Sequence, residues 1–139
     1  MRYLGVDYGE RRTGLALSDP EGRVAYTLKV LTHWSPSDQL AEVLREARSS
    51  GSAAVVVGRP LSLAGEEGPA ARKVQRFAGR LSSQGVRVVL LDERLTTRQA
   101  KNALQTAGVG ERAQRSVVDQ VAATLILQSY LDHLNASPA

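Results

Sequence analysis

The sequence contains no cysteine and only two histidines, His33 and His133. Disulfide bonds, thiolate zinc sites and cysteine nucleophiles are therefore excluded, and a histidine-rich metal site is disfavoured. Any metal that the chain binds must be held by oxygen ligands. Oxygen ligands favour Mg²⁺ or Mn²⁺, so these two ions are the expected cofactors.

The sequence also lacks the features of a secreted or membrane protein. No apolar run approaches membrane-spanning length, and no basic segment followed by an apolar one opens the chain. There is no internal repeat, low-complexity tract or long linker among the 139 residues, of which 42% are hydrophobic. We expect one cytoplasmic domain covering residues 1–139, with no membrane partner.

Positive charge is unevenly distributed along the chain. Lys and Arg number 18 and Asp and Glu number 14, which gives a net charge of +4. Residues 94–115 contain five cations and one acid, and a second stretch without acids carries Arg72, Arg76 and Arg80 at helical spacing. Clustered arginine is typical of proteins that bind phosphate backbones, although a solvated helix face would look similar.

Hydrophobic periodicity predicts an α/β fold. Patterns typical of strands occupy residues 2–7, 13–18, 23–31, 53–58 and 86–91. Four helices are expected: one from the Ser35 cap signal to Gly51, one that buries Val74 to Leu81 and stops near Gly85, one from Thr96 or Thr97 to about Ala107, and one from about Ser116 to Leu134. A leading hairpin followed by βα units predicts a five-stranded mixed sheet flanked by helices.

Three carboxylates lie at the ends of predicted elements. Asp7 ends the first strand, Glu93 follows the last strand, and Asp119 lies in the expected first turn of the last helix. If the first and last strands are parallel neighbours, Asp7 and Glu93 emerge at the same edge of the sheet, where α/β sites form. Converging carboxylates repel one another unless a cation lies between them, so this arrangement predicts a divalent-metal site.

Each acid also has an ordinary structural explanation. Asp7 could cap the hairpin turn, and Glu93 could pair with Arg94 or Arg98. Asp119 could be an acid favoured by the dipole at a helix start. The combination of three acids at element ends is what favours the metal site.

The last helix is expected to pack closely on the sheet. Its predicted buried stripe comprises Val118, Val121, Ala122, Leu125 and Leu131. The small side chains of Ala122 and Ala123 would let the helix approach the sheet and bring the short Asp119 side chain to the metal.

Four segments of the chain resemble the bacterial YqgF/RuvX family. They are Gly5–Gly9 with Arg12–Gly14, Val57–Leu61 followed by Gly65–Pro69, Asp92–Thr97, and Val118–Ala123. The resemblance extends from Leu4 to Leu131, and the string Asp92–Thr97 is its most specific part. It implies an RNase H-like fold and a nuclease of the kind described as processing pre-16S rRNA or resolving Holliday junctions. The catalytic acids of the family fall on Asp7, Glu93 and Asp119.

The chemistry that this resemblance implies is phosphodiester hydrolysis with two metal ions, Asp7 bridging them and Glu93 and Asp119 each holding one side. The expected substrates are pre-rRNA, branched DNA or both, and a junction resolvase would also need a homodimer. Candidate residues for contact with nucleic acid, Tyr8 through stacking and the arginines through phosphates, are Tyr8, Arg11, Arg12, Arg59, Arg72, Arg76, Arg94, Arg98 and Arg115.

Two other classes of protein share some of these features. Actin-like ATPases and sugar kinases also cradle phosphates in Asp-x-Gly turns, but they place two such domains around a nucleotide cleft, and this chain has the size of one. A non-catalytic nucleic-acid-binding or ribosome-associated module with the same fold is the main alternative.

Overall fold

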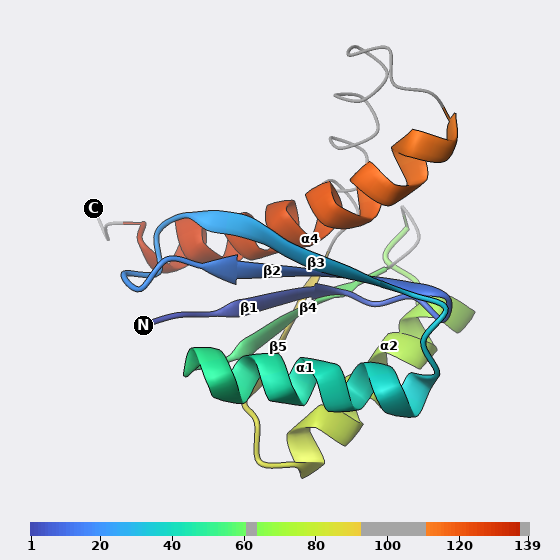
Figure 1. The fold of residues 1–139 in the computed structure, drawn as a ribbon, viewed down its shortest axis with the longest axis horizontal. Helices are drawn as coiled ribbons and strands as arrows, with labels where there is room; N and C mark the ends of the chain where they lie inside the picture. The colour runs from blue at the N-terminus through green and yellow to red at the C-terminus, as the bar shows by residue number, and fades with distance from the viewer. Residues whose placement is uncertain (61–63, 93–110, 137–139) are drawn as a thin grey trace.

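The structure is a computed structural model that describes residues 1–60, 64–92 and 111–136, without the side chains of residues 111–120 (Figure 1). Its five strands are β1 (Leu4–Asp7), β2 (Arg12–Ser18), β3 (Ala25–Thr32), β4 (Val55–Arg59) and β5 (Val88–Asp92). The described helices are α1 (Pro36–Ser50), α2 (Pro69–Ser83) and α4 (Glu111–Leu134).

The strands form one mixed sheet in the order β3-β2-β1-β4-β5. The central strand β1 pairs antiparallel with β2 and parallel with β4, as the predicted hairpin and βα units require. Helices α1 and α2 cover one face of the sheet and α4 covers the other (Figure 1). The predicted five-stranded mixed sheet flanked by helices is therefore confirmed.

Alternating residues of β1 divide the hydrophobic core into two parts. Leu4 and Val6 are fully buried in a cluster that includes Phe77 of α2. Gly5, between them, faces α4, where it lies against Ala123 and Leu127. This alternation is the period-two pattern of a strand that is buried on both faces.

Helix α1 begins and ends where the sequence predicts. The Ser35 hydroxyl accepts a hydrogen bond from the Asp38 backbone N–H at 3.1 Å, and Pro36 occupies the first helical position. At the other end, Gly51 adopts a left-handed conformation with φ of 64° and closes the helix. A residue with a Cβ adopts this conformation only at a cost in free energy.

Helix α4 begins at Glu111, five residues before the predicted start at Ser116. The prediction of Asp119 in the first turn is therefore wrong, because Asp119 is the ninth residue of the helix. The five added residues, 111–115, are good helix formers with no apolar period, so the sequence pattern did not show them. Because the dipole acts within the first turn, it does not account for Asp119.

The first and last strands are parallel but not neighbours, because β4 lies between β1 and β5. The expectation of a core strand at residues 86–91 also fails, since β5 is the edge strand and Leu90 is 40% exposed. The predicted helix from residue 96 or 97 to about 107 lies outside the described residues.

The described half of α4 buries a stripe that is shifted from the predicted one. Val121 and Leu125 are only half-buried. The buried residues are Ala122, Ala123, Ile126, Leu127, Tyr130 and Leu131. Among the described residues, no helix is long and apolar enough to cross a membrane.

Candidate functional site

Asp7 is the last residue of the central strand, at the edge of the sheet where the parallel strands end. Val6 pairs with Val57, so Asp7 lies level with the next residue of β4, Gly58, which in turn pairs with Leu91 of β5. The carboxyl ends of three parallel strands therefore meet at one edge. This edge is the usual place for a functional site in an open α/β sheet.

The Asp7 side chain belongs to the α4 face of the sheet. Successive residues of a strand point to opposite faces, so Asp7 follows Gly5 toward α4, whereas Val6 points toward α1 and α2. Asp7 is half-buried and engages other groups of the protein.

Helix α4 runs antiparallel to β1 and approaches it closely. The Tyr3 ring packs edge-on against Tyr130, with ring centroids 5.5 Å apart. Two residues further along β1, a Cβ on Gly5 would lie 2.7 Å from the Leu127 Cβ and 3.1 Å from the Ala123 carbonyl oxygen. The close approach of this helix to the sheet, expected from Ala122 and Ala123, is therefore confirmed, and the missing side chain of Gly5 makes room for it.

This antiparallel alignment gives an expected level for position 119 of α4 relative to Asp7. Two residues of strand advance about 6.7 Å, and four residues of helix advance about 6 Å in the opposite direction. Gly5 lies against Leu127 and Ala123. Two residues further along β1, Asp7 would accordingly lie level with the residues four positions earlier in α4, Ala123 and Asp119. We therefore expect position 119 near the edge at which β1 ends, and the placement of Asp119 itself stays a prediction.

The other predicted ligand and three of the predicted arginines cannot be placed. Glu93 directly follows the last residue of β5, Asp92, and lies outside the described residues, as do Arg94 and Arg98. Arg115 lies in the part of α4 that has no described side chains. No group of three acids or histidines that could hold a metal occurs within the described part of the chain.

A buried hydrogen-bond network, which the sequence did not reveal, holds the turn that follows Asp7. Gln39 of α1 is fully buried, and its Nε2 donates to the carbonyl oxygens of Glu10 at 3.0 Å and Trp34 at 3.2 Å. Both amide hydrogens are thereby used, so the Gln39 Oε1 accepts from the Thr13 hydroxyl. The Thr13 oxygen in turn accepts from the Gly9 N–H at 3.2 Å.

Because every polar atom in this network has a partner, the network fixes the β1–β2 turn rather than straining it. Gly9 contributes a further constraint, since a Cβ at this position would collide with the carbonyl oxygen of Arg12. The turn beside Asp7 is therefore held by α1 and by its own backbone. No pattern in the sequence marks Gln39, because two of its three partners are main-chain carbonyl groups.

Tyr8 of the same turn points to the α1 and α2 side of the sheet. Its ring stacks on Phe77 with centroids 4.3 Å apart and an interplanar angle of 22°. Partial burial raises the pKa of the Tyr8 hydroxyl above its usual value of 10.0, so the hydroxyl keeps its proton at neutral pH. Because Phe77 covers one face of the Tyr8 ring, the predicted stacking of Tyr8 on a base must use the opposite face.

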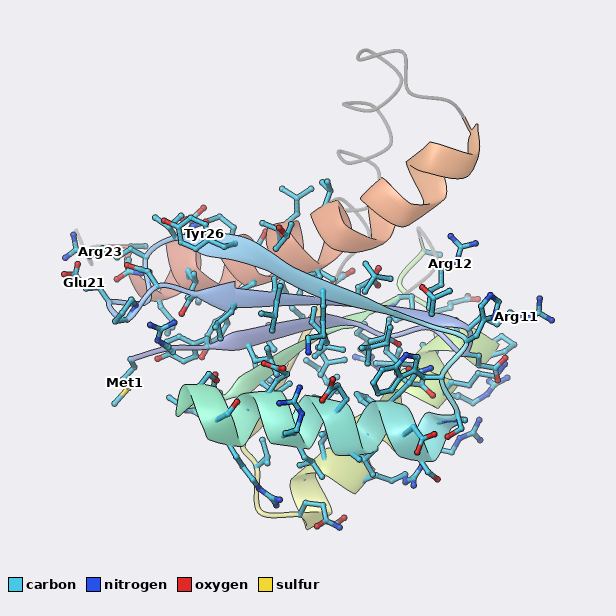
Figure 2. All side chains as sticks on the ribbon, viewed as in Figure 1. Met1, Arg11, Arg12, Glu21, Arg23 and Tyr26 are labelled. Carbon is cyan, nitrogen blue, oxygen red and sulfur yellow. The ribbon has the colours of Figure 1, made fainter. Side chains whose placement is uncertain are left out.

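Three of the predicted phosphate-binding arginines, Arg11, Arg12 and Arg59, lie at this end of the sheet. Arg11 of the β1–β2 turn and Arg12, the first residue of β2, lie at the opposite end of the sheet from Met1, Glu21 and Arg23 (Figure 2). Arg59, the last residue of β4, forms an ion pair with Glu67.

On α2, Arg72, Arg76 and Arg80 are all exposed, as their spacing predicts. Their exposure makes the stripe accessible to a ligand. It does not distinguish a phosphate-binding face from a solvated one.

Comparison with known proteins assigns this chain to a family. The family model described as RuvX, Holliday junction resolvase, matches residues 1–133. The chain belongs to the RuvX family. A relative from Chloroflexus aurantiacus, with the provisional name pre-16S rRNA nuclease, is 42% identical over 136 residues, 97% of this chain and 89% of the relative. A relative of the same name from Desulforudis audaxviator is 44% identical over 133 residues, 95% of this chain and 94% of the relative.

Solved structures support the RNase H-like fold of this RuvX-family chain. RuvC from T. thermophilus, in complex with a Holliday junction substrate, aligns with a TM-score of 0.61 and 23% identity over 100% of this chain and 99% of RuvC. The large terminase nuclease of phage G20c with bound magnesium aligns with a TM-score of 0.56 and 15% identity, over 90% of this chain and 80% of the nuclease. At these identities the likeness shows the fold, and the implied RNase H-like architecture is confirmed.

Proposed function

We propose that this RuvX-family protein is a divalent-metal-dependent endonuclease that hydrolyses phosphodiester bonds in structured nucleic acid. The observation that carries the proposal is the position of Asp7. It ends the central strand on the face covered by α4, at the edge where the parallel strands end. The family match and the nuclease names of the relatives favour this function over a non-catalytic binding module.

The residues present suit an oxygen-liganded metal. The chain has no cysteine, and the predicted ligands Asp7, Glu93 and Asp119 are carboxylates, the donors that Mg²⁺ and Mn²⁺ prefer. The fold relative from phage G20c binds magnesium in one structure and zinc in another. When bound, the metal would supply an activated water and neutralise charge on the phosphate.

The protein itself supplies position and charge. The network of Gln39 and Thr13 holds the turn that follows Asp7, so the carboxylate is presented from a fixed backbone. Arg11 on that turn and Arg12 directly after it are suited to hold the phosphates that flank the cleaved bond.

Substitution of Asp7 by Asn tests this assignment. An amide of the same shape removes the negative charge that holds the cation but leaves the basic surface intact. We expect cleavage to be abolished, Mn²⁺ affinity in calorimetry to fall, and binding of nucleic acid to persist. Glu93→Gln and Asp119→Asn should behave alike.

Asp19→Asn is the matched control. The Asp19 Oδ1 accepts backbone hydrogen bonds from Arg23 at 2.7 Å and Val24 at 2.9 Å, at the opposite end of the sheet, and Asn retains that acceptor. This variant should cleave like the wild type. An Asp7→Asn variant that keeps more than a small part of wild-type activity would show that Asp7 is not a ligand.

The physiological substrate is a finer question that matched substrates address. The relatives are named for pre-16S rRNA and the family for Holliday junctions. We propose a cytoplasmic nuclease that binds both RNA and DNA. Metal chemistry at a phosphate does not itself distinguish ribose from deoxyribose, so both substrates can be cleaved by the same site. Cleavage of a four-way DNA junction and of a 16S precursor fragment, each with Mg²⁺ and with Mn²⁺, compares the two directly.

A further inference from the structure

A cavity of about 450 Å³ lies beside the turn that follows Asp7, on the opposite face of the sheet from the Asp7 side chain. It lies between this turn and the start of α2. Its lining comprises Tyr8, Gly9, Glu10, Pro69, Ala70 and Lys73. None of these residues is among the predicted metal ligands, and only Tyr8 is among the predicted contacts with nucleic acid.

An ion pair between an acid and a base from different elements lines this cavity. The Lys73 Nζ of α2 lies 2.8 Å from the Glu10 Oε1 of the β1–β2 turn, and the side chains are 41% and 61% exposed. The hydrogen bond from Lys73 is the main cause that lowers the pKa of the Glu10 carboxyl, so Glu10 stays charged at neutral pH. An ion pair this exposed contributes little to stability, so its partners can exchange.

Positive charge continues along α2 from this cavity. Arg76 and Arg80 follow the lining residue Lys73 by three and seven residues, about one and two helical turns. Helix α2 carries no acid anywhere in Pro69–Ser83. Among the described residues that line the cavity, Glu10 is the one acid, and it pairs with the one lysine.

We propose that this cavity binds a backbone phosphate of the nucleic-acid substrate, at a position away from the cleaved bond. In the free protein Glu10 occupies Lys73 as an internal counterion. On binding, Lys73 exchanges Glu10 for the phosphate, and the Tyr8 hydroxyl, which also lines the cavity, donates a second hydrogen bond to it. The proposal rests on the proposed function, because it takes the substrate of Asp7 as its ligand.

The alternation of β1 explains why this phosphate differs from the one that is cleaved. The Asp7 and Tyr8 side chains leave the chain on opposite faces of the same edge. A strand of nucleic acid that crosses the edge can contact both, with phosphates a few nucleotides apart. The exposed Arg72, Arg76 and Arg80 then continue the path along α2.

Binding measurements in an Asp7→Asn background test the proposal without cleavage. The probes are a fluorescein-labelled four-way DNA junction and a labelled 16S precursor fragment, followed by anisotropy over a range of KCl concentrations. Removal of one phosphate contact changes the slope of log K against log salt by about 0.9, which corresponds to about eightfold in affinity at 0.1 M. We expect Lys73→Met to weaken binding by about eightfold and to lower the slope by about 1.

Glu10→Gln gives an effect of opposite sign. Removing the internal counterion frees Lys73, so this variant should bind several-fold more tightly than the background protein. Tyr8→Phe keeps the ring on Phe77 but loses the donor, and should weaken binding by about fivefold. A solvated ion pair with no ligand predicts no change for any of the three variants.

Glu21→Gln and Arg23→Met are the matched controls. Glu21 and Arg23 form an exposed pair at 3.9 Å, at the opposite end of the sheet (Figure 2). Each control changes the net charge as its test variant does. If Glu10→Gln or Lys73→Met affects binding no more than its control, the phosphate site is refuted.

The same experiment separates this proposal from the proposed function. If the wild type cleaves and Lys73→Met binds nucleic acid as Arg23→Met does, the phosphate site is refuted and the proposed function stands. A wild type that binds with the predicted variant effects but never cleaves refutes the nuclease and leaves the site standing. Failure to bind either probe refutes both.

Discussion

Gly5 of β1 lies directly against Leu127 of α4, so closely that a Cβ on Gly5 would lie 2.7 Å from the Leu127 Cβ. The Ala123 carbonyl oxygen would be 3.1 Å from the same atom. The absence of a side chain at this one strand position sets how near α4 approaches the sheet. Asp7 is two residues further along β1, and position 119 is four residues from Ala123 in α4, so we expect this contact to influence the spacing of the proposed metal site.

Gly5→Ala should therefore destabilise the protein and impair cleavage. Neither the strand nor the helix backbone can yield without moving α4, and overpacking of this kind costs about 1–3 kcal/mol. Urea unfolding gives the stability, and initial cleavage rates give the activity. Gly79→Ala is the control, because nothing lies within 4 Å of that added Cβ in α2. It should stabilise the protein by up to about 1 kcal/mol, and equal effects of the two variants would contradict this account.

The hydroxyl of Thr13 gives a second prediction. Thr13→Val keeps the shape of the side chain but leaves the Gln39 Oε1 and the Gly9 N–H without a partner in a buried site. Each unsatisfied group costs about 1–3 kcal/mol. Hydrogen exchange at the Gly9 amide should become faster and cleavage should fall, because the turn beside Asp7 loosens. Thr13→Ser retains the hydroxyl and should stay near wild type in both measurements, and a Ser variant as impaired as the Val variant would exclude the hydrogen bond as the cause.

These two contacts show where the sequence was informative and where it was not. The strands and α1 were predictable because their signals are local: alternating apolar residues, the Ser35 cap and the left-handed Gly51. The close packing of α4 was expected from the small residues Ala122 and Ala123, which are a local feature too. Gln39 was missed, since a buried polar residue can be recognised only from partners that lie far away in the sequence.

The less accurate predictions have a common physical cause. The insertion of β4 between β1 and β5 is a matter of topology, which no local pattern encodes. Residues 111–115 at the early start of α4 lack an apolar period, so only helix propensity carried the signal. The proposed acids Glu93 and Asp119 depend on non-local convergence in the same way, and they stay predictions.

The arginine stripe of α2 gives a third prediction. Neutralising Arg72, Arg76 and Arg80 together to Gln should weaken binding of nucleic acid and lower the salt slope by up to about 3, because each arginine would otherwise neutralise about one phosphate. The measurement is anisotropy at several salt concentrations. Arg23, Arg48 and Arg87 form the control set, with the same loss of charge at exposed positions elsewhere on the protein. A salt slope that is equal in the two triple variants would mean that the stripe is only a solvated face.

A fourth prediction concerns acid stability. Glu42 is largely buried and accepts hydrogen bonds from Arg45 and from Lys29, and these contacts lower the pKa of its carboxyl below 4.5. Because the pKa of Glu42 is lower in the folded state than in the unfolded state, its charge stabilises the folded protein at any pH above the unfolded-state pKa. This stabilisation is lost as the pH falls through the folded-state pKa. Glu42→Gln should therefore be less stable by about 1 kcal/mol at pH 7, with a difference that shrinks below pH 4.5.

Urea unfolding across this pH range measures the difference for Glu42. Glu21→Gln, which alters an exposed pair with Arg23 at 3.9 Å, should change stability by less than about 0.5 kcal/mol. A Glu42→Gln difference that stays constant down to low pH would show that poorer packing, rather than the missing charge, is responsible.

The last prediction concerns assembly, which separates the two candidate substrates. A junction resolvase must cut two strands symmetrically, so its working form is a two-fold dimer with paired active sites. An rRNA-trimming nuclease can work as a monomer. Sedimentation of the Asp7→Asn variant with and without a four-way junction reports the assembly, and the wild type reports whether the two nicks are coordinated. A strict monomer that trims the 16S precursor would exclude the resolvase. A dimer that cuts the junction with coordinated nicks and leaves the precursor intact would exclude the rRNA nuclease. The substrate would then be selected by the two-fold symmetry of the dimer, and not by recognition of the 2′-hydroxyl of RNA.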